Sequence, residues 1–158
     1  MKENVLDVLM FLFENFIYDE DAEDPDREVL ESQLVEVGFH RADIEKAFSW
    51  LEDLASQQRS AHATLVPGSA IRVYSESEIR RLDTECRGFL MFLTQKGYLT
   101  PTHHELVVDR VLALDQEEVD LERLKWIILM VLFNQPGQEA AFEWMEGQVF
   151  DNYAGYIQ

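Results

Sequence analysis

Apolar residues recur at intervals of three and four along most of this chain, and this period constrains the fold more than any other feature. Between Arg41 and Leu54 the apolar positions are Ile44, Ala47, Phe48, Leu51 and Leu54. This spacing is typical of one face of an α-helix. Similar stripes run through residues 5–17, 29–37, 79–93, 106–114 and 141–150. The sequence therefore predicts a mainly α-helical protein.

Two of these segments are more apolar than a surface helix. Residues 5–17 carry apolar side chains on more than one face, and the segment from Leu121 to Phe133 is apolar on all sides from Trp126 onward. A helix that is hydrophobic all round belongs inside a protein rather than on its surface. We expect both helices to run through the core.

Local signals predict where several helices begin and end. Ser75 with Glu78 forms a capping box, and the stripe after it predicts one long helix that stops at Gly97. Thr100 followed by Pro101 marks another helix start, Asp120 a third, and Gly38 a helix end.

The segment after the first three helices indicates a short β-hairpin. Thr64-Leu65-Val66 and Ile71-Arg72-Val73-Tyr74 flank Pro67-Gly68, a turn-forming pair. Helices followed by a β wing match a winged-helix arrangement. We therefore predict a winged-helix-like subdomain over residues 1–74, with three helices and the hairpin, and a helical subdomain over residues 75–158 that shares its core.

The charge balance argues against direct binding of nucleic acid. The chain has 13 Lys and Arg against 31 Asp and Glu, a net charge of −18. Residues 1–58 alone hold 16 acidic and 4 basic residues, a balance of −12. Because phosphates are repelled by such a surface, the expected partner is a protein with a basic surface.

Cysteine usage and hydropathy predict a cytoplasmic protein. Cys86 is the single cysteine, so no internal disulfide can form, and no leader-like segment precedes the first helix. The longest apolar run, Trp126 to Phe133, is eight residues and is too short to cross a bilayer. No membrane association is expected.

Residues that could carry chemistry favour structural roles. The acidic run from Asp19 to Asp26 does not fit a calcium-binding loop that starts at Asp19. The sixth position of that loop is Asp24 where glycine is needed, and the twelfth is Leu30 where glutamate is needed. His103 and His104 are adjacent rather than one helical turn apart, so we do not expect them to bind a metal. We expect them to cap a helix or to lie on the surface. Cys86 lies on an apolar stripe, where cysteine is usually an inert packing residue. We expect no catalytic residue, metal or cofactor.

The leading hypothesis is a non-enzymatic adaptor or regulator whose acidic amino-terminal half docks on a basic protein. The candidate partner-binding residues are Asp19, Asp21, Glu23, Asp24, Asp43, Glu45, Glu52 and Asp53. One alternative is a DNA mimic in which these carboxylates stand in for phosphates, and another is an enzyme that uses Cys86 or His104. Direct nucleic-acid binding through the winged helix, a structural subunit role, and charge that only maintains solubility also stay open.

Several segments resemble the bacterial Smg proteins, a family of unknown function found mainly in proteobacteria. The resemblance covers the whole chain and rests on Val5 to Glu14, Gly38-Phe39, Trp50-Leu51-Glu52, Arg72-Val73-Tyr74, Arg81-Leu82-Asp83, Cys86 to Leu90, Arg110 to Asp115, Leu124-Lys125-Trp126, Leu129 to Asn134 and Pro136-Gly137. It implies no activity, catalytic residue or cofactor. Genes of the family tend to lie beside those for a DNA-uptake and processing protein, a type I topoisomerase and the formyl-methionine enzymes. The resemblance therefore implies a DNA-processing protein, or the machinery that starts translation, as a possible partner.

Overall fold

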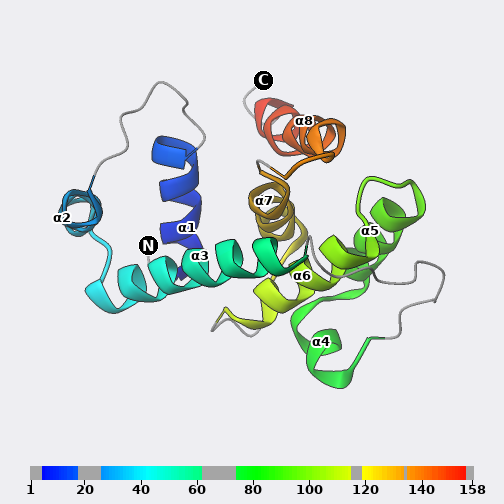
Figure 1. Cartoon of the computed structure of the whole chain (residues 1–158), viewed down its shortest axis with the longest axis horizontal. Helices are drawn as coiled ribbons and strands as arrows, with labels where there is room; N and C mark the ends of the chain where they lie inside the picture. The colour runs from blue at the N-terminus through cyan, green and yellow to red at the C-terminus, as the bar shows by residue number, and fades with distance from the viewer. Residues whose placement is uncertain (1–4, 18–25, 62–73, 115–118, 134, 156–158) are drawn as a thin grey trace. The chain divides into compact units, whose positions relative to one another are not determined.

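A computed structural model describes residues 5–17, 26–61, 74–114, 119–133 and 135–155 of the chain (Figure 1). These residues are all-α, and the helices follow one another as α1 (Val5–Leu12), a π-helical turn η1 (Phe13–Ile17), α2 (Arg27–Val37), α3 (Arg41–Ala61), α4 (Glu76–Arg81), α5 (Thr84–Gln95), α6 (Pro101–Leu112), α7 (Leu121–Leu132) and α8 (Glu139–Gly155).

The chain divides into two compact units, Met1–Asp53 and Leu54–Gln158. The division falls inside α3, so the first part of this helix belongs to the first unit and its end to the second. The subdomains expected from the sequence, residues 1–74 and 75–158, stay a prediction.

In the first unit, α1 supplies most of the buried apolar surface. Its side chains of Val5, Leu6, Val8, Leu9 and Leu12 are buried, as is Phe13 in the π-helical turn. The rings of Phe11 and Phe39 meet edge to face with their centroids 5.8 Å apart. The expectation that this first helix is largely buried is confirmed for the residues described.

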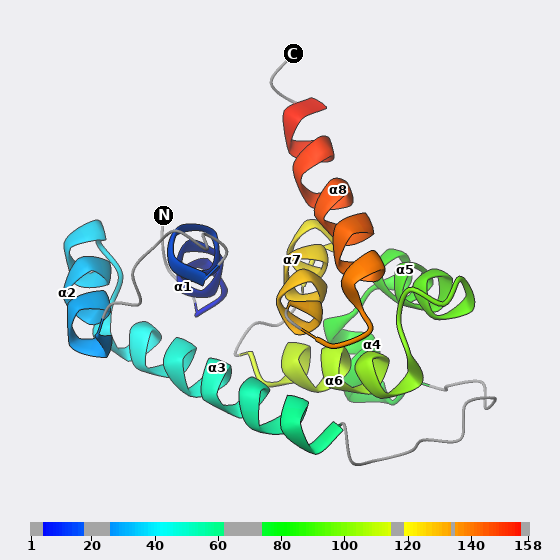
Figure 2. The same cartoon turned by 45° about the horizontal axis from the view of Figure 1, so that its top comes forward.

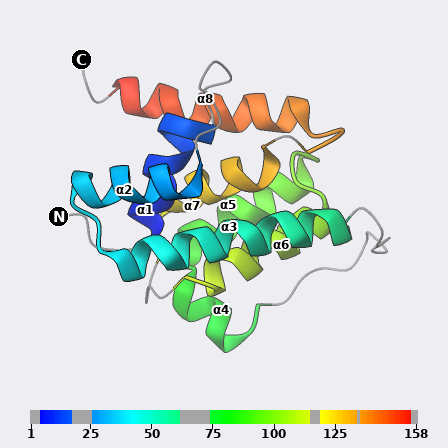
Figure 3. The ribbon, with the colours of Figure 1, turned by 60° about the vertical axis from the view of Figure 1, so that its left-hand side comes forward.

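A left-handed glycine turns the chain from α2 back over the first part of α3 (Figure 3). Gly38 has φ 117°, and its N–H donates to the carbonyl oxygens of Leu34 and Val35, while the N–H of Phe39 donates to Leu34. These bonds satisfy carbonyls at the end of α2, as in a Schellman motif. The predicted helix stop at Gly38 is confirmed.

In the second unit, α7 is the central helix. All six residues from Ile127 to Leu132 are at most 3% exposed. Figure 2 shows α7 between α6 and α8, and it packs on both and on α5. The interior position predicted for this helix is confirmed, because a helix with no polar face must be covered on every side.

The single long helix predicted from Ser75 to Gly97 is wrong, although its capping box is present. Ser75 and Glu78 bond reciprocally at the start of α4. The helix then ends, because Leu82 takes an extended conformation and the Asp83 carboxylate accepts a hydrogen bond from the N–H of Cys86 as the N-cap of α5. The N–H of Val119 donates to the Arg81 carbonyl at this break. A competing cap thus divides an uninterrupted apolar stripe.

The predicted fold class is also wrong: no strand occurs in the described residues, and the winged-helix-like arrangement is unsupported. Of the predicted hairpin, residues 64–73 lie outside the described part. The helix whose apolar stripe was read from Arg41 to Leu54 continues through the polar residues that follow, and α3 ends at Ala61. There Gln57 Nε2 donates to Asp109 Oδ2 at 2.8 Å, and Gln58 Nε2 donates to the Val131 carbonyl at 2.9 Å. Both glutamines lie in the second unit and bind residues of α6 and α7 there, so their polarity does not mark a helix end.

Candidate protein-binding groove

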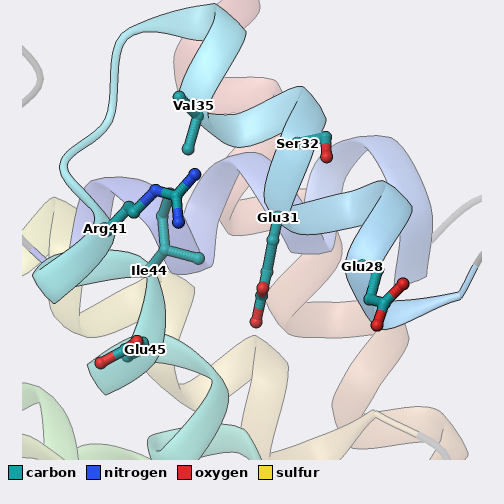
Figure 4. Close-up of a pocket in the computed structure, with 7 residues that line it drawn as sticks. All are labelled: Glu28, Glu31, Ser32, Val35, Arg41, Ile44 and Glu45. Atoms are coloured by element: carbon teal, nitrogen blue, oxygen red, sulfur yellow. The ribbon is translucent and has the colours of Figure 1, made fainter.

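Two facing stripes of α2 and α3 line a groove of about 340 Å³ in the first unit (Figure 4). On α2 the stripe is Glu28, Glu31, Ser32 and Val35; on α3 it is Arg41, Ile44 and Glu45. Both sets follow the three- and four-residue spacing of one helix face. The residues that should form a seam between two packed helices are therefore mostly charged.

The groove stays open because α2 contributes little apolar surface to the core. Leu34 is the one buried residue of this helix, whereas Val29 and Val35 are 46% and 40% exposed. On the opposite side Ile44 is buried, at 2% exposed. Val35 and Ile44 thus give the groove an apolar part between exposed carboxylates, instead of closing it.

Arg27 connects α2 to α3 beside the groove. Its Nε lies 3.2 Å from Glu31 Oε1 and its Nη1 lies 2.7 Å from Glu52 Oε1. Its guanidinium carbon also lies 4.7 Å from the centroid of the Phe48 ring. All three charged side chains are at least 40% exposed, so each ion pair contributes only about 0.2–1 kcal/mol to stability. Together they connect the amino-terminal part of α2 to α3.

Among the lining residues that the structure describes, Arg41 is the one cation, and its guanidinium lies between Val35 and Ile44 in the view of Figure 4. No ion pair to Arg41 occurs within the described ranges of the chain. The groove therefore presents three carboxylates, from Glu28, Glu31 and Glu45, against one guanidinium. Its balance is acidic, which favours a cationic ligand group.

The structure brings together only part of the predicted partner-binding set. Glu45 is exposed and lines the groove, Glu52 is exposed and bound by Arg27, Asp53 is exposed, and Asp43 is half-buried. The other four candidates, Asp19, Asp21, Glu23 and Asp24, lie outside the described residues. Sequence reasoning missed Glu28, Glu31 and Arg27. The signal was the stripe of residues 28, 31, 32 and 35, which is polar where α2 faces α3.

Cys86 is placed as a packing residue. Its side chain is fully buried, and its Sγ lies 3.3 Å from the Val119 carbonyl oxygen, to which the thiol donates. Burial, with a smaller contribution from the Asp83 carboxylate, raises the pKa of the Cys86 thiol to about 12. Because the thiolate is the nucleophilic form, this thiol is unreactive at neutral pH.

Of the surface or capping roles expected for His103 and His104, the surface role is wrong, because both side chains are buried at the start of α6. Thr100 is the N-cap, as predicted, and its hydroxyl lies 2.7 Å from His103 Nδ1. His103 Nε2 lies 3.4 Å from Gln135 Oε1. The His103 ring therefore connects α6 to the turn after α7.

Among the described residues, no three His, Cys, Asp or Glu side chains are grouped so as to hold a metal ion.

An aromatic cluster in the second unit was not predicted. The rings of Tyr98 and Trp144 stack with centroids 4.5 Å apart, and Phe89 and Phe92 lie 6.3 and 6.0 Å from Trp144. Phe92 is 40% exposed. The cluster joins α5 to α8.

None of the helices in the described segments combines the length and hydropathy needed to span a membrane.

Comparison with known proteins places this chain in a family. The family model described as "Protein of unknown function (DUF494)" matches residues 5–158. The chain is 57% identical to the "Protein Smg homolog" of Nitrosococcus oceani, over 99% of both chains. It is 53% identical to that of Alkalilimnicola ehrlichii over 96% of both chains, and 48% identical to that of Methylococcus capsulatus over 99% of both. No solved structure shows significant similarity. The chain therefore belongs to the family of Smg homologues, proteins of unknown function, as its sequence motifs indicated.

Proposed function

We propose that this chain is a non-enzymatic adaptor or regulator that binds a protein with a basic surface through the α2–α3 groove. The observation that carries the proposal is the groove itself, in which the exposed carboxylates of Glu28 and Glu45 and the half-buried carboxylate of Glu31 surround an apolar part formed by Val35 and Ile44. Acidic and apolar groups side by side suit a partner segment with basic and aliphatic side chains.

Charge distribution supports this role. Of the net −18, −12 resides in residues 1–58, which include every residue that lines the groove. A field of this sign attracts a basic protein over several ångströms and is screened by salt. It repels phosphates, so a nucleic-acid ligand is disfavoured.

The proposed partner is a DNA-processing protein in the cytoplasm, because such proteins carry basic surfaces that bind DNA. The chain would then contact the partner without contacting DNA. A DNA mimic makes a different prediction, since it must compete with duplex DNA for the partner, whereas an adaptor can be retained when DNA is added.

Affinity capture with charge-reversed variants tests the proposal. The groove variant carries Glu28→Lys and Glu45→Lys, at the second residue of α2 and the fifth of α3. The control carries Glu85→Lys and Glu143→Lys, at the second residue of α5 and the fifth of α8, so the helix positions match. All four glutamates are exposed, and either pair changes the net charge by the same amount.

The proposal predicts that the native chain and the control retain the same basic protein at low salt, and that the groove variant loses it. Raising the salt concentration should release that protein. Equal retention by both variants, or retention indifferent to salt, would rule out the groove as the docking surface. Release by added duplex DNA would instead favour the DNA mimic.

A further inference from the structure

In the first unit, the arginine side chain of Arg27 on α2 is held against residues of α2 and α3. The guanidinium of Arg27 lies over the Phe48 ring at 4.7 Å and contacts carboxylate oxygens of Glu31 and Glu52 at 3.2 and 2.7 Å. An aromatic face combined with carboxylates at its edge is well suited to a guanidinium, which is planar, delocalised and able to stack.

This arginine site is continuous with the groove. Phe48 and Glu52 extend the α3 stripe of Arg41, Ile44 and Glu45, because positions 41, 44, 45, 48 and 52 follow helical spacing. Glu31 belongs to both, since it lines the groove and accepts from Arg27. The same pair of helix faces thus holds an internal arginine at one place and leaves carboxylates available at another.

We propose that the groove binds an arginine side chain of the partner, and that Arg27 is an internal occupant which competes for the shared carboxylate of Glu31. This inference rests on the proposed function. The partner's guanidinium would pair with Glu28, Glu31 or Glu45, and its aliphatic stem would lie on the exposed side chain of Val35.

Arginine is favoured over lysine for a reason specific to this groove. Arg41 offsets part of the negative charge, so attraction by net charge alone is weakened. Directed carboxylate–guanidinium pairs then decide the affinity, and a planar guanidinium forms two parallel bonds where an ammonium acts as a point charge.

Two blocked alanine-based peptides test the inference, identical except that one carries two arginines one helical turn apart and the other carries two lysines. Binding to the full chain is measured by fluorescence anisotropy at low salt. The arginine peptide should bind about fivefold tighter or more than the lysine peptide. Equal affinities for the two peptides would overturn the proposal.

Substitutions that remove the charge of a glutamate test whether the arginine peptide binds in the groove. Glu28→Gln with Glu45→Gln should weaken binding of the arginine peptide about tenfold, and Glu85→Gln with Glu143→Gln should leave it unchanged. Equal losses in the two variants would show that the peptide responds to net charge alone, and would also overturn the proposal.

Arg27→Gln tests the competition. Removing the internal guanidinium frees Glu31 and Glu52, so affinity for the arginine peptide should rise about threefold. The control is Arg123→Gln, which removes an arginine of similar exposure paired with Asp120 in the second unit. A fall in affinity in Arg27→Gln, with or without a loss of helical circular dichroism, would mean that Arg27 only supports α2, and would overturn the inference.

The two failures can be told apart. If the arginine peptide shows no preference but capture of the basic protein still depends on Glu28 and Glu45, the arginine inference is wrong and the proposed function stands. If capture does not depend on these glutamates, the proposed function fails whatever the peptides do.

Discussion

The hydroxyl of Tyr74 lies 2.8 Å from Nε2 of His104 and ties the residue before α4 to α6. Thr94 donates its hydroxyl hydrogen to the Leu90 carbonyl at 2.9 Å, so it accepts from His104 Nδ1, which lies 3.2 Å away. A neutral ring protonated at Nδ1 then leaves Nε2 to accept from Tyr74. This chain of bonds assigns the tautomer of a buried histidine.

Tyr74→Phe should lower the free energy of unfolding by about 1–2 kcal/mol, because it removes a hydrogen bond to the ring of the buried His104. Urea denaturation measures this. Tyr98→Phe is the control, since Tyr98 contributes a stacked ring on Trp144 that the substitution keeps. A Tyr74→Phe variant as stable as Tyr98→Phe would contradict the assigned bond.

The Cys86 thiol should resist alkylation in the folded protein and make stability fall at high pH. Its pKa is raised from 9.0 to about 12, so between these values the unfolded chain loses the proton first. The free energy of unfolding therefore declines as pH rises from 9 to 12, and is unaffected by this group below pH 9. Comparison with Cys86→Ala isolates the effect. Identical slopes in the two proteins would show that the thiol is not perturbed.

Two glycines should respond in opposite directions to alanine. Gly88 lies within α5 and a Cβ there would meet open space, so Gly88→Ala should stabilise the protein by about 0.5–1 kcal/mol. Gly97 has φ 81°, and Gly97→Ala should destabilise it by about 1 kcal/mol. Thermal unfolding of both variants checks the pair. A loss of stability in Gly88→Ala would mean that the exposed face of α5 is covered.

Leu34 should account for most of the packing of α2. It is fully buried, and Leu34→Ala should cost about 2–5 kcal/mol. Val29→Ala, at a position 46% exposed, should change the free energy of unfolding by less than about 0.5 kcal/mol. Helical circular dichroism during urea titration reports both. Similar costs at the two positions would refute the account of α2 as a helix anchored by a single buried side chain.

Local chemistry predicted much of this fold. The left-handed Gly38, the capping box of Ser75 and the N-caps Thr100 and Asp120 depend on bonds within a few residues, so the sequence alone specifies them. The interior position of α7 also followed, because its apolar residues leave no polar face.

The structural predictions failed where contacts between residues far apart in the sequence determine the local structure. The stripe through residues 79–93 is continuous, yet the chain leaves the helix at Leu82, which pairs with Val119 far along the sequence. The apolar stripe of α3 stops at Leu54, yet the helix continues to Ala61, where Gln57 and Gln58 bind Asp109 and Val131. The histidines at positions 103 and 104 looked exposed because Gln135 and Tyr74 could not be placed beside them from the sequence.

Of the candidate site, the sequence predicted only that it carries negative charge. The acidic face of α3 followed from the spacing of Glu45 and Glu52. That α2 faces it with Glu28 and Glu31 instead of an apolar seam depends on the angle set at Gly38, which helical periodicity does not specify. The four acids between residues 19 and 24 stay a prediction.

Site-specific photocrosslinking in cells of the native host tests the central claim most directly. A photoreactive residue replaces Ser32, which is exposed in the groove, and in a second strain replaces Gln95, which is exposed at the end of α5. The account predicts that position 32 alone captures a protein through an arginine-bearing basic segment. No capture at position 32, or equal capture at positions 32 and 95, would contradict the groove as the surface through which this protein acts.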